Sequence, residues 1–101
     1  MAEIEINADR VLVRLDAPAT TELTREELVF PENIRHILLD CRGVKMITSL
    51  PLAAIMLMLD REKRRSQLEF LNVEPELRHL LERTGLARWL KIHPPGTDQD
   101  V

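Results

Sequence analysis

The neighbouring hydroxyl residues Thr48 and Ser49 stand directly before a strongly apolar stretch, residues 50–59. Ser49 suits the N-cap of a helix, since its hydroxyl can accept from a first-turn amide and Pro51 has no N–H to leave unpaired there. A hydroxyl at a helix N-terminus can also carry a phosphoryl group, which adds about two negative charges beside an apolar surface. The pair therefore indicates either a helix cap or a phosphorylation switch.

The other reactive side chains do not form a recognisable catalytic or metal site. Cys41 is the single cysteine, and its neighbourhood has one glycine and several bulky residues, so a small buried cysteine is favoured over a phosphate-cradling thiolate. His36, His79 and His93 share no metal-ligand spacing, and the sequence has no glycine-rich nucleotide loop. We therefore expect no catalytic activity, no metal ion and no cofactor.

Composition narrows the classes of partner. The net charge is −3 with both signs interspersed, and the aromatic residues are two Phe and one Trp, which argues against nucleic-acid binding. The single cysteine suits a reducing compartment, and the acidic N-terminal residues do not resemble a signal peptide. The longest apolar run reaches about half the length of a membrane span. These features predict a cytoplasmic protein without membrane insertion.

The elements that position the two hydroxyls begin with an N-terminal hairpin. Residues 3–6 alternate strictly, residues 11–15 are rich in β-formers, and turn residues separate them. A capping box at Thr24 predicts a short helix that Pro31 ends. The continuous apolar run at residues 37–39 is typical of a strand covered on both faces in a mostly parallel sheet.

Residues 51–65 predict the strongest helix, with apolar side chains on more than one side. The i, i+3, i+4, i+7 rule gives it a core face of Leu52, Ile55, Met56 and Leu59. The side chains expected to project to the opposite side are Ala54, Leu57 and Met58. The second half of this segment is charged throughout, so the exposed apolar side chains gather next to Ser49. They indicate a partner surface, unless neighbouring elements cover them.

The last third of the sequence continues the alternation of strands and helices. Residues 68–73 predict a strand, and Pro75 opens a helix with Leu77, Leu80 and Leu81 facing inward and Gly85 as a left-handed stop. Residues 86–92 fit either a short strand or a helix. We expect a single domain over residues 1–93 and a flexible tail over residues 94–101.

The resulting order, β-β-α-β-α-β-α, predicts an α/β fold with a sheet backed by helices. At this point the sequence resembles the STAS domains, a family named for sulfate transporters and anti-sigma factor antagonists. The similarity is densest at residues 34–44, 46–53 and 80–86. Residues 48–53 stand where the family has an Asp-Ser-x-Gly-Leu-Gly pattern. The resemblance implies a mixed sheet with helices mainly on one face.

The resemblance also implies a protein-binding module in bacterial regulation. In the anti-sigma antagonist branch, the unphosphorylated domain binds a serine-kinase anti-sigma factor and frees the sigma factor, and phosphorylation of the serine at the helix start breaks that complex. Carried over to this sequence, the phosphoacceptor is Ser49, with Thr48 as the secondary candidate. The predicted partner-binding residues are Arg42, Met46, Leu50, Pro51, Leu52, Ala53, Ala54, Leu57 and Met58.

The sequence departs from the family pattern at three positions. Thr48 replaces the usual Asp, while Pro51 and Ala53 replace two glycines and add bulk where a partner approaches. Other branches of the family are unphosphorylated adaptor subunits of signalling scaffolds or of lipid-transport ABC complexes, and this reading stays open as the alternative. A homodimer formed through the apolar helix surface also stays open.

Overall fold

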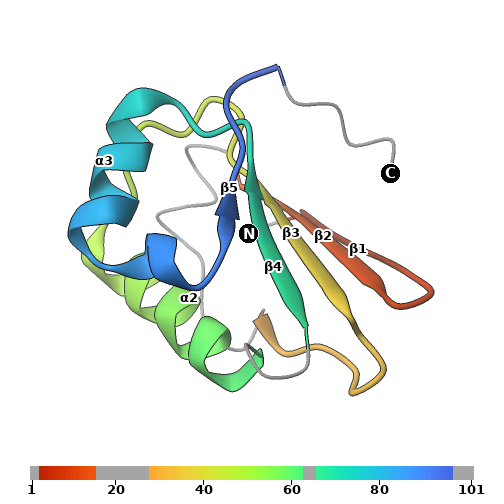
Figure 1. The fold of residues 1–101 in the computed structure, drawn as a ribbon. Helices are drawn as coiled ribbons and strands as arrows, with labels where there is room; N and C mark the ends of the chain where they lie inside the picture. The colour runs from red at the N-terminus through yellow and green to blue at the C-terminus, as the bar shows by residue number, and fades with distance from the viewer. Residues whose placement is uncertain (1–2, 16–27, 63–65, 97–101) are drawn as a thin grey trace.

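Five strands form one mixed sheet in the computed structural model, which describes residues 3–15, 28–62 and 66–96 (Figure 1). The strands are β1 (Glu3–Asn7), β2 (Arg10–Arg14), β3 (His36–Asp40), β4 (Gln67–Leu71) and β5 (Lys91–Ile92). They lie in this order across the sheet; β1 and β2 pair antiparallel, and each later pair is parallel. The predicted hairpin and the largely parallel sheet are confirmed.

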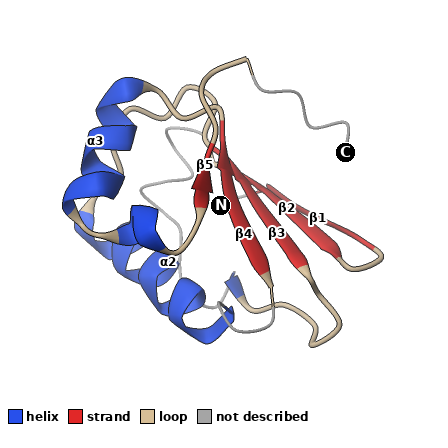
Figure 2. Cartoon of the chain, viewed as in Figure 1, coloured by secondary structure: helices blue, strands red, loops and turns tan. Residues whose placement is uncertain are grey.

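The helices α2 (Ser49–Glu62) and α3 (Pro75–Arg83) lie on the same side of the sheet (Figure 2). Each connects two parallel strands, since α2 joins β3 to β4 and α3 with the 3-10 helix η2 (Leu86–Arg88) joins β4 to β5. Parallel neighbours need such a crossover because a tight turn cannot join them. The predicted α/β fold, a mixed sheet with helices mainly on one face, is confirmed.

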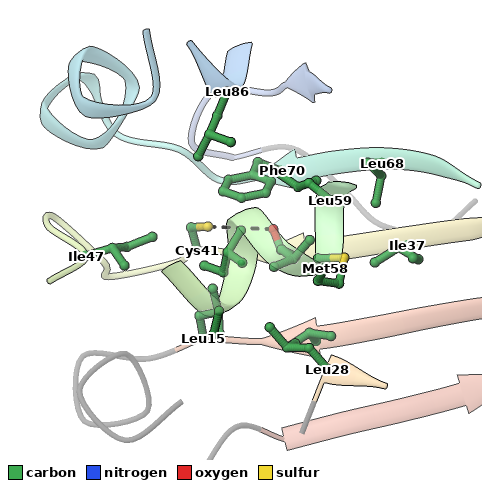
Figure 3. Close-up of a cluster of buried hydrophobic side chains, with 14 of the residues drawn as sticks. Leu15, Leu28, Ile37, Cys41, Ile47, Met58, Leu59, Leu68, Phe70 and Leu86 are labelled. Atoms are coloured by element: carbon green, nitrogen blue, oxygen red, sulfur yellow. Dashed lines mark hydrogen bonds between the residues drawn. The ribbon is translucent and has the colours of Figure 1, made fainter. Parts of the chain in front are cut away.

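The hydrophobic core fills the space between the sheet and α2 (Figure 3). Val11, Ile37 and Phe70 are fully buried on three neighbouring strands, and Ile55 and Met58 of α2 are buried with them. Strand β3 occupies the centre of the sheet, which explains why its sequence is continuously apolar. The core therefore fixes which face of α2 points inward.

The C-terminal elements settle a choice that the sequence leaves open. Residues 86–92 form both predicted alternatives in succession, first η2 and then β5. The φ angle of Gly85 is 82°, so the predicted left-handed stop after α3 is confirmed. The helix predicted from Thr24 starts outside the described residues. The boundary at residue 93 stays a prediction.

The predicted buried face of α2 is correct at Ile55 and Leu59, but the observed face is rotated from the predicted one by somewhat less than the ~100° between successive residues. The buried residues of this helix are Pro51, Ala54, Ile55, Met58, Leu59 and Glu62. Met56 is 43% exposed, whereas Ala54 and Met58 lie in the core instead of projecting away from it. Glu62 belongs to the charged second half, yet it is buried and its carboxylate accepts from Arg61 Nε at 2.8 Å.

We expect Met58→Ala to destabilise the protein by about 2–5 kcal/mol, because it opens a cavity in the core. Its matched control is Leu57→Ala, one residue away on the surface, which should change stability by about 0.5 kcal/mol or less. Urea unfolding followed by circular dichroism measures both. A larger loss for Leu57→Ala than for Met58→Ala would contradict the orientation of α2.

Candidate functional site

A tight turn at the end of β3 leads the chain toward the start of α2. The Val44 N–H donates to the Cys41 carbonyl at 2.9 Å, and Gly43 between them has a φ of 78°. A positive φ at the third position of a four-residue turn favours glycine, as in a type II turn. The Arg42 N–H donates to Asp40 Oδ1 at 3.1 Å, which ties the turn to the end of the strand. Arg42 itself is exposed.

Helix α2 begins at Ser49, two residues before the predicted start at residue 51. The Leu52 N–H donates to the Thr48 carbonyl at 3.0 Å, so Thr48 accepts the first helical hydrogen bond and occupies the N-cap position. Ser49 is then the first helical residue rather than the cap. Both residues are exposed. The reading of Ser49 as a mere helix cap is therefore wrong, and Thr48 takes that position.

Ser49 lies on the exposed side of α2 beside apolar residues. With about 100° of rotation per residue, Ser49, Ala53 and Met56 follow each other along one stripe, and Leu50 and Leu57 lie on its flank. Leu50 is 82% exposed and Leu57 is 51% exposed. We call the exposed apolar residues around Ser49 the Ser49 surface; they are Met46, Leu50, Ala53, Met56 and Leu57.

Some of the other predicted partner-binding residues are buried, and others are exposed. Pro51, Ala54 and Met58 are buried in the core, so the prediction that they contribute to the exposed surface is wrong. Leu52 is half-buried and packs against the core. Conversely, the spacing of Met56 predicts a core position, but this side chain is exposed and belongs to the Ser49 surface. The Ser49 surface thus contains Met46, Leu50, Ala53 and Leu57 of the predicted partner-binding residues, about half of that set.

The electrostatics at the start of α2 favour an added negative charge. The amides of Ser49 and Leu50 lie in the first turn, where backbone N–H groups have no intrahelical acceptor. All of this turn is described, and it carries no acidic side chain that would complement the positive end of the helix dipole. A phosphoryl group on Ser49 would therefore meet a favourable helix end while adding charge to the Ser49 surface.

Cys41, the residue directly after β3, is a buried thiol. Its Sγ is 3.7 Å from the Leu39 carbonyl oxygen, to which the thiol donates (Figure 3). Burial, with a smaller contribution from the charge of Asp40, raises the pKa of the Cys41 thiol to about 12. The thiol is therefore neutral at physiological pH and does not behave as a nucleophile. The prediction of a small buried cysteine is confirmed.

The described residues hold no cluster of three or more His, Cys, Asp or Glu side chains that could bind a metal ion. The three histidines lie on different elements: His36 on β3, His79 on α3, and His93 just after β5. His93 Nε2 is 2.7 Å from Glu69 Oε1 on β4. Among the described helices, none is long and apolar enough to cross a membrane.

A polar network that the sequence does not predict joins three distant segments at this end of the sheet. Asn72 Nδ2 donates to Asp40 Oδ1 at 2.9 Å, and the Gly96 N–H donates to Asn72 Oδ1 at 3.0 Å. The local sequence contains one signal for this network, because Asn72 directly follows a strand and asparagine tolerates a positive φ. Asn72 has a φ of 57°.

Comparisons with known proteins agree with this fold. The family model of the STAS domain matches residues 3–95. An anti-sigma-factor antagonist (STAS) domain protein from Planctomyces limnophilus has 14% sequence identity and a TM-score of 0.75, over 98% of this chain and 92% of that one. The NMR structure of the protein TM1081 has 19% identity and a TM-score of 0.76, over 94% of this chain and 82% of that one.

A crystal structure of TM1081 from Thermotoga maritima, described as a candidate anti-sigma factor antagonist, is also similar. It has 18% identity and a TM-score of 0.64, over 94% of this chain and 87% of that one. At such identities these structures support the shared fold alone. No curated protein sequence matches the chain.

We expect the Cys41 thiol of the folded protein to resist iodoacetamide at pH 8, because it is buried and its pKa is raised to about 12. The urea-unfolded chain, whose thiol has an ordinary pKa of about 8.5, is the control and should react readily. Mass spectrometry of both samples over time measures the difference. Equal rates in the two samples would show that the thiol is accessible and would contradict this placement.

Proposed function

Since this chain belongs to the STAS domain family, we propose that it is a regulatory protein-binding module of the anti-sigma factor antagonist type. Its proposed partner is an anti-sigma factor of the serine-kinase class, which docks on the Ser49 surface. The proposal assigns Ser49 as the phosphoacceptor, with Thr48 as the secondary candidate. Phosphorylation by the partner would then end the complex.

The observation that carries this proposal is the position of Ser49 within an exposed apolar stripe. Ser49 is exposed and lies in line with Ala53 and Met56 along α2. Leu50, the next residue, is 82% exposed, an uncommon position for a large apolar side chain at a helix start. A contiguous exposed apolar surface supports a partner site, and a phosphoryl group in its midst would have to be desolvated when the partner docks.

Two departures from the family pattern obstruct this surface less than their size suggests. Pro51 replaces a glycine, but it is buried against the core and adds no bulk to the exposed side. Ala53 replaces the second glycine and is exposed, so it adds one methyl group to the surface. A partner therefore meets a ridge formed mainly by Leu50 and Leu57, with a small residue between them.

The alternative function is an adaptor that is not phosphorylated. Thr48 stands in place of the family's Asp and occupies the N-cap position, so the acidic residue beside the acceptor is missing. The Ser49 surface would then be a permanent interface within a signalling scaffold or a lipid-transport complex. In both readings the protein has no catalytic activity of its own and acts in the cytoplasm, and both of these statements stay predictions from the sequence.

The two readings predict different results for Ser49→Glu. If Ser49 is a switch, the added charge should abolish recovery of the partner from native-host lysate, because the charge is desolvated in the contact. The fold should remain intact, since a negative charge near a helix N-terminus contributes about 0.3–1 kcal/mol of stabilisation. Mass spectrometry identifies the partners and also tests the endogenous protein for a phosphoryl group on Ser49 or Thr48.

Ser49→Ala is the matched control and should recover the partner as wild type does. Loss of a kinase-fold regulator with Ser49→Glu alone supports the switched antagonist. Recovery of the same scaffold or transporter subunits by all three baits, with no phosphate found, would support the adaptor instead.

We further expect Leu50→Ala to weaken binding of the recovered partner by about tenfold or more, because it truncates the most exposed large apolar side chain of the Ser49 surface. Trp89→Ala is a matched control, since Trp89 is 54% exposed in the segment between η2 and β5 and does not belong to the Ser49 surface. Both variants should keep wild-type stability. Isothermal titration calorimetry measures the affinities, and equal losses for the two variants would argue against the Ser49 surface.

A further inference from the structure

The polar network of Asp40, Asn72 and Gly96 lies at the carboxyl ends of β3 and β4, where the chain also leaves toward α2 (Figure 1). Asp40 Oδ1 accepts two hydrogen bonds, from Asn72 Nδ2 at 2.9 Å and from the Arg42 N–H at 3.1 Å. Asn72 Oδ1 accepts from the Gly96 N–H at 3.0 Å. One amide side chain thus joins the turn before α2 to the C-terminal segment.

Asn72 is well suited to this bridge for two reasons. Its φ of 57° lies in the left-handed region, which asparagine tolerates better than most residues. Its side chain is 3% exposed, and its amide both donates and accepts, so the two halves of the amide serve different segments. The backbone groups on either side of Asn72 already form other hydrogen bonds. The Leu71 carbonyl accepts from the Cys41 N–H, and the Val73 N–H donates to the His93 carbonyl.

We propose that Asn72 is a positioning residue for the turn that carries Arg42 and leads to the Ser49 surface. By donating to Asp40, it fixes the carboxylate that in turn holds the Arg42 amide. By accepting from the Gly96 N–H, it also connects the C-terminal segment to this turn. The effect on partner binding rests on the proposed function, whereas the effect on the turn does not.

Different substitutions of Asn72 separate its hydrogen bond to Asp40 from its hydrogen bond to Gly96. Asn72→Asp keeps an oxygen for the Gly96 amide but replaces the donor to Asp40 with a second carboxylate, which repels it. Asn72→Gly tolerates the same backbone angle and removes both hydrogen bonds. Asn33→Asp is the matched control, since Asn33 Nδ2 donates at 3.3 Å to the Ala8 carbonyl, near the opposite end of the strands.

The test is amide hydrogen exchange by NMR on the full chain. In Asn72→Asp, the Arg42 amide should exchange about tenfold faster, as expected from weakening a hydrogen bond to a charged group, while Gly96 stays protected. In Asn72→Gly, both amides should exchange faster, and in Asn33→Asp neither should. An unchanged Arg42 amide in Asn72→Asp, or an equal rise at all amides, would overturn the proposal.

Partner binding is measured separately, with the partner that the wild-type protein recovers. Asn72→Asp should bind it about tenfold more weakly, and Asn33→Asp should bind it as wild type does. Wild-type affinity for Asn72→Asp, together with a faster Arg42 amide, would overturn the link between the turn and binding. If wild type recovers no partner, the proposed function fails, and the exchange rates still decide whether Asn72 positions the turn.

Discussion

A helix that packs on a sheet can bury one side only, and α2 carries apolar side chains on both. The sheet selects the side with Ile55 and Met58, which are fully buried against Ile37 and Phe70. Leu50 and Leu57 consequently remain on the surface. Covering exposed apolar area contributes roughly 25 cal/mol per square ångström before the entropic and desolvation costs of association are subtracted. The packing of the core therefore determines which residues are left for a partner.

The same constraint explains how much of the fold the sequence could predict. The hairpin, the parallel strands and the two crossover helices each have a local pattern, and these patterns were sufficient for the architecture. The rotation of α2 was not predictable, because the buried Ala54 and Met58 are the same residue types as the exposed Ala53 and Met56. Periodicity separates two faces only when one of them is polar. Glu62 added to the error, because its charge indicated solvent while the structure buries it.

Of the candidate site, Ser49 could be predicted from the sequence, whereas the polar network around Asn72 could not. Ser49 was identified through the family resemblance and the apolar stretch that follows it, both of which are local in sequence. The contact of Asp40 with Asn72 spans 32 positions, and that of Asn72 with Gly96 spans 24. No local pattern marks such pairs, since an acid and an amide at strand ends are common. Only the parallel register, which places Asp40 beside Leu71, brings Asp40 next to the following residue, Asn72.

In the proposed function, a protein partner covers the Ser49 surface. The most direct test of this contact is a photo-crosslinking residue placed at Ala53 in the native host, with a second variant at exposed Gln67 of β4 as the control. We expect the residue at position 53 to crosslink to one protein, and we expect the additional substitution Ser49→Glu to remove this adduct. Capture of the same protein from Gln67, with none from Ala53, would contradict the proposed contact.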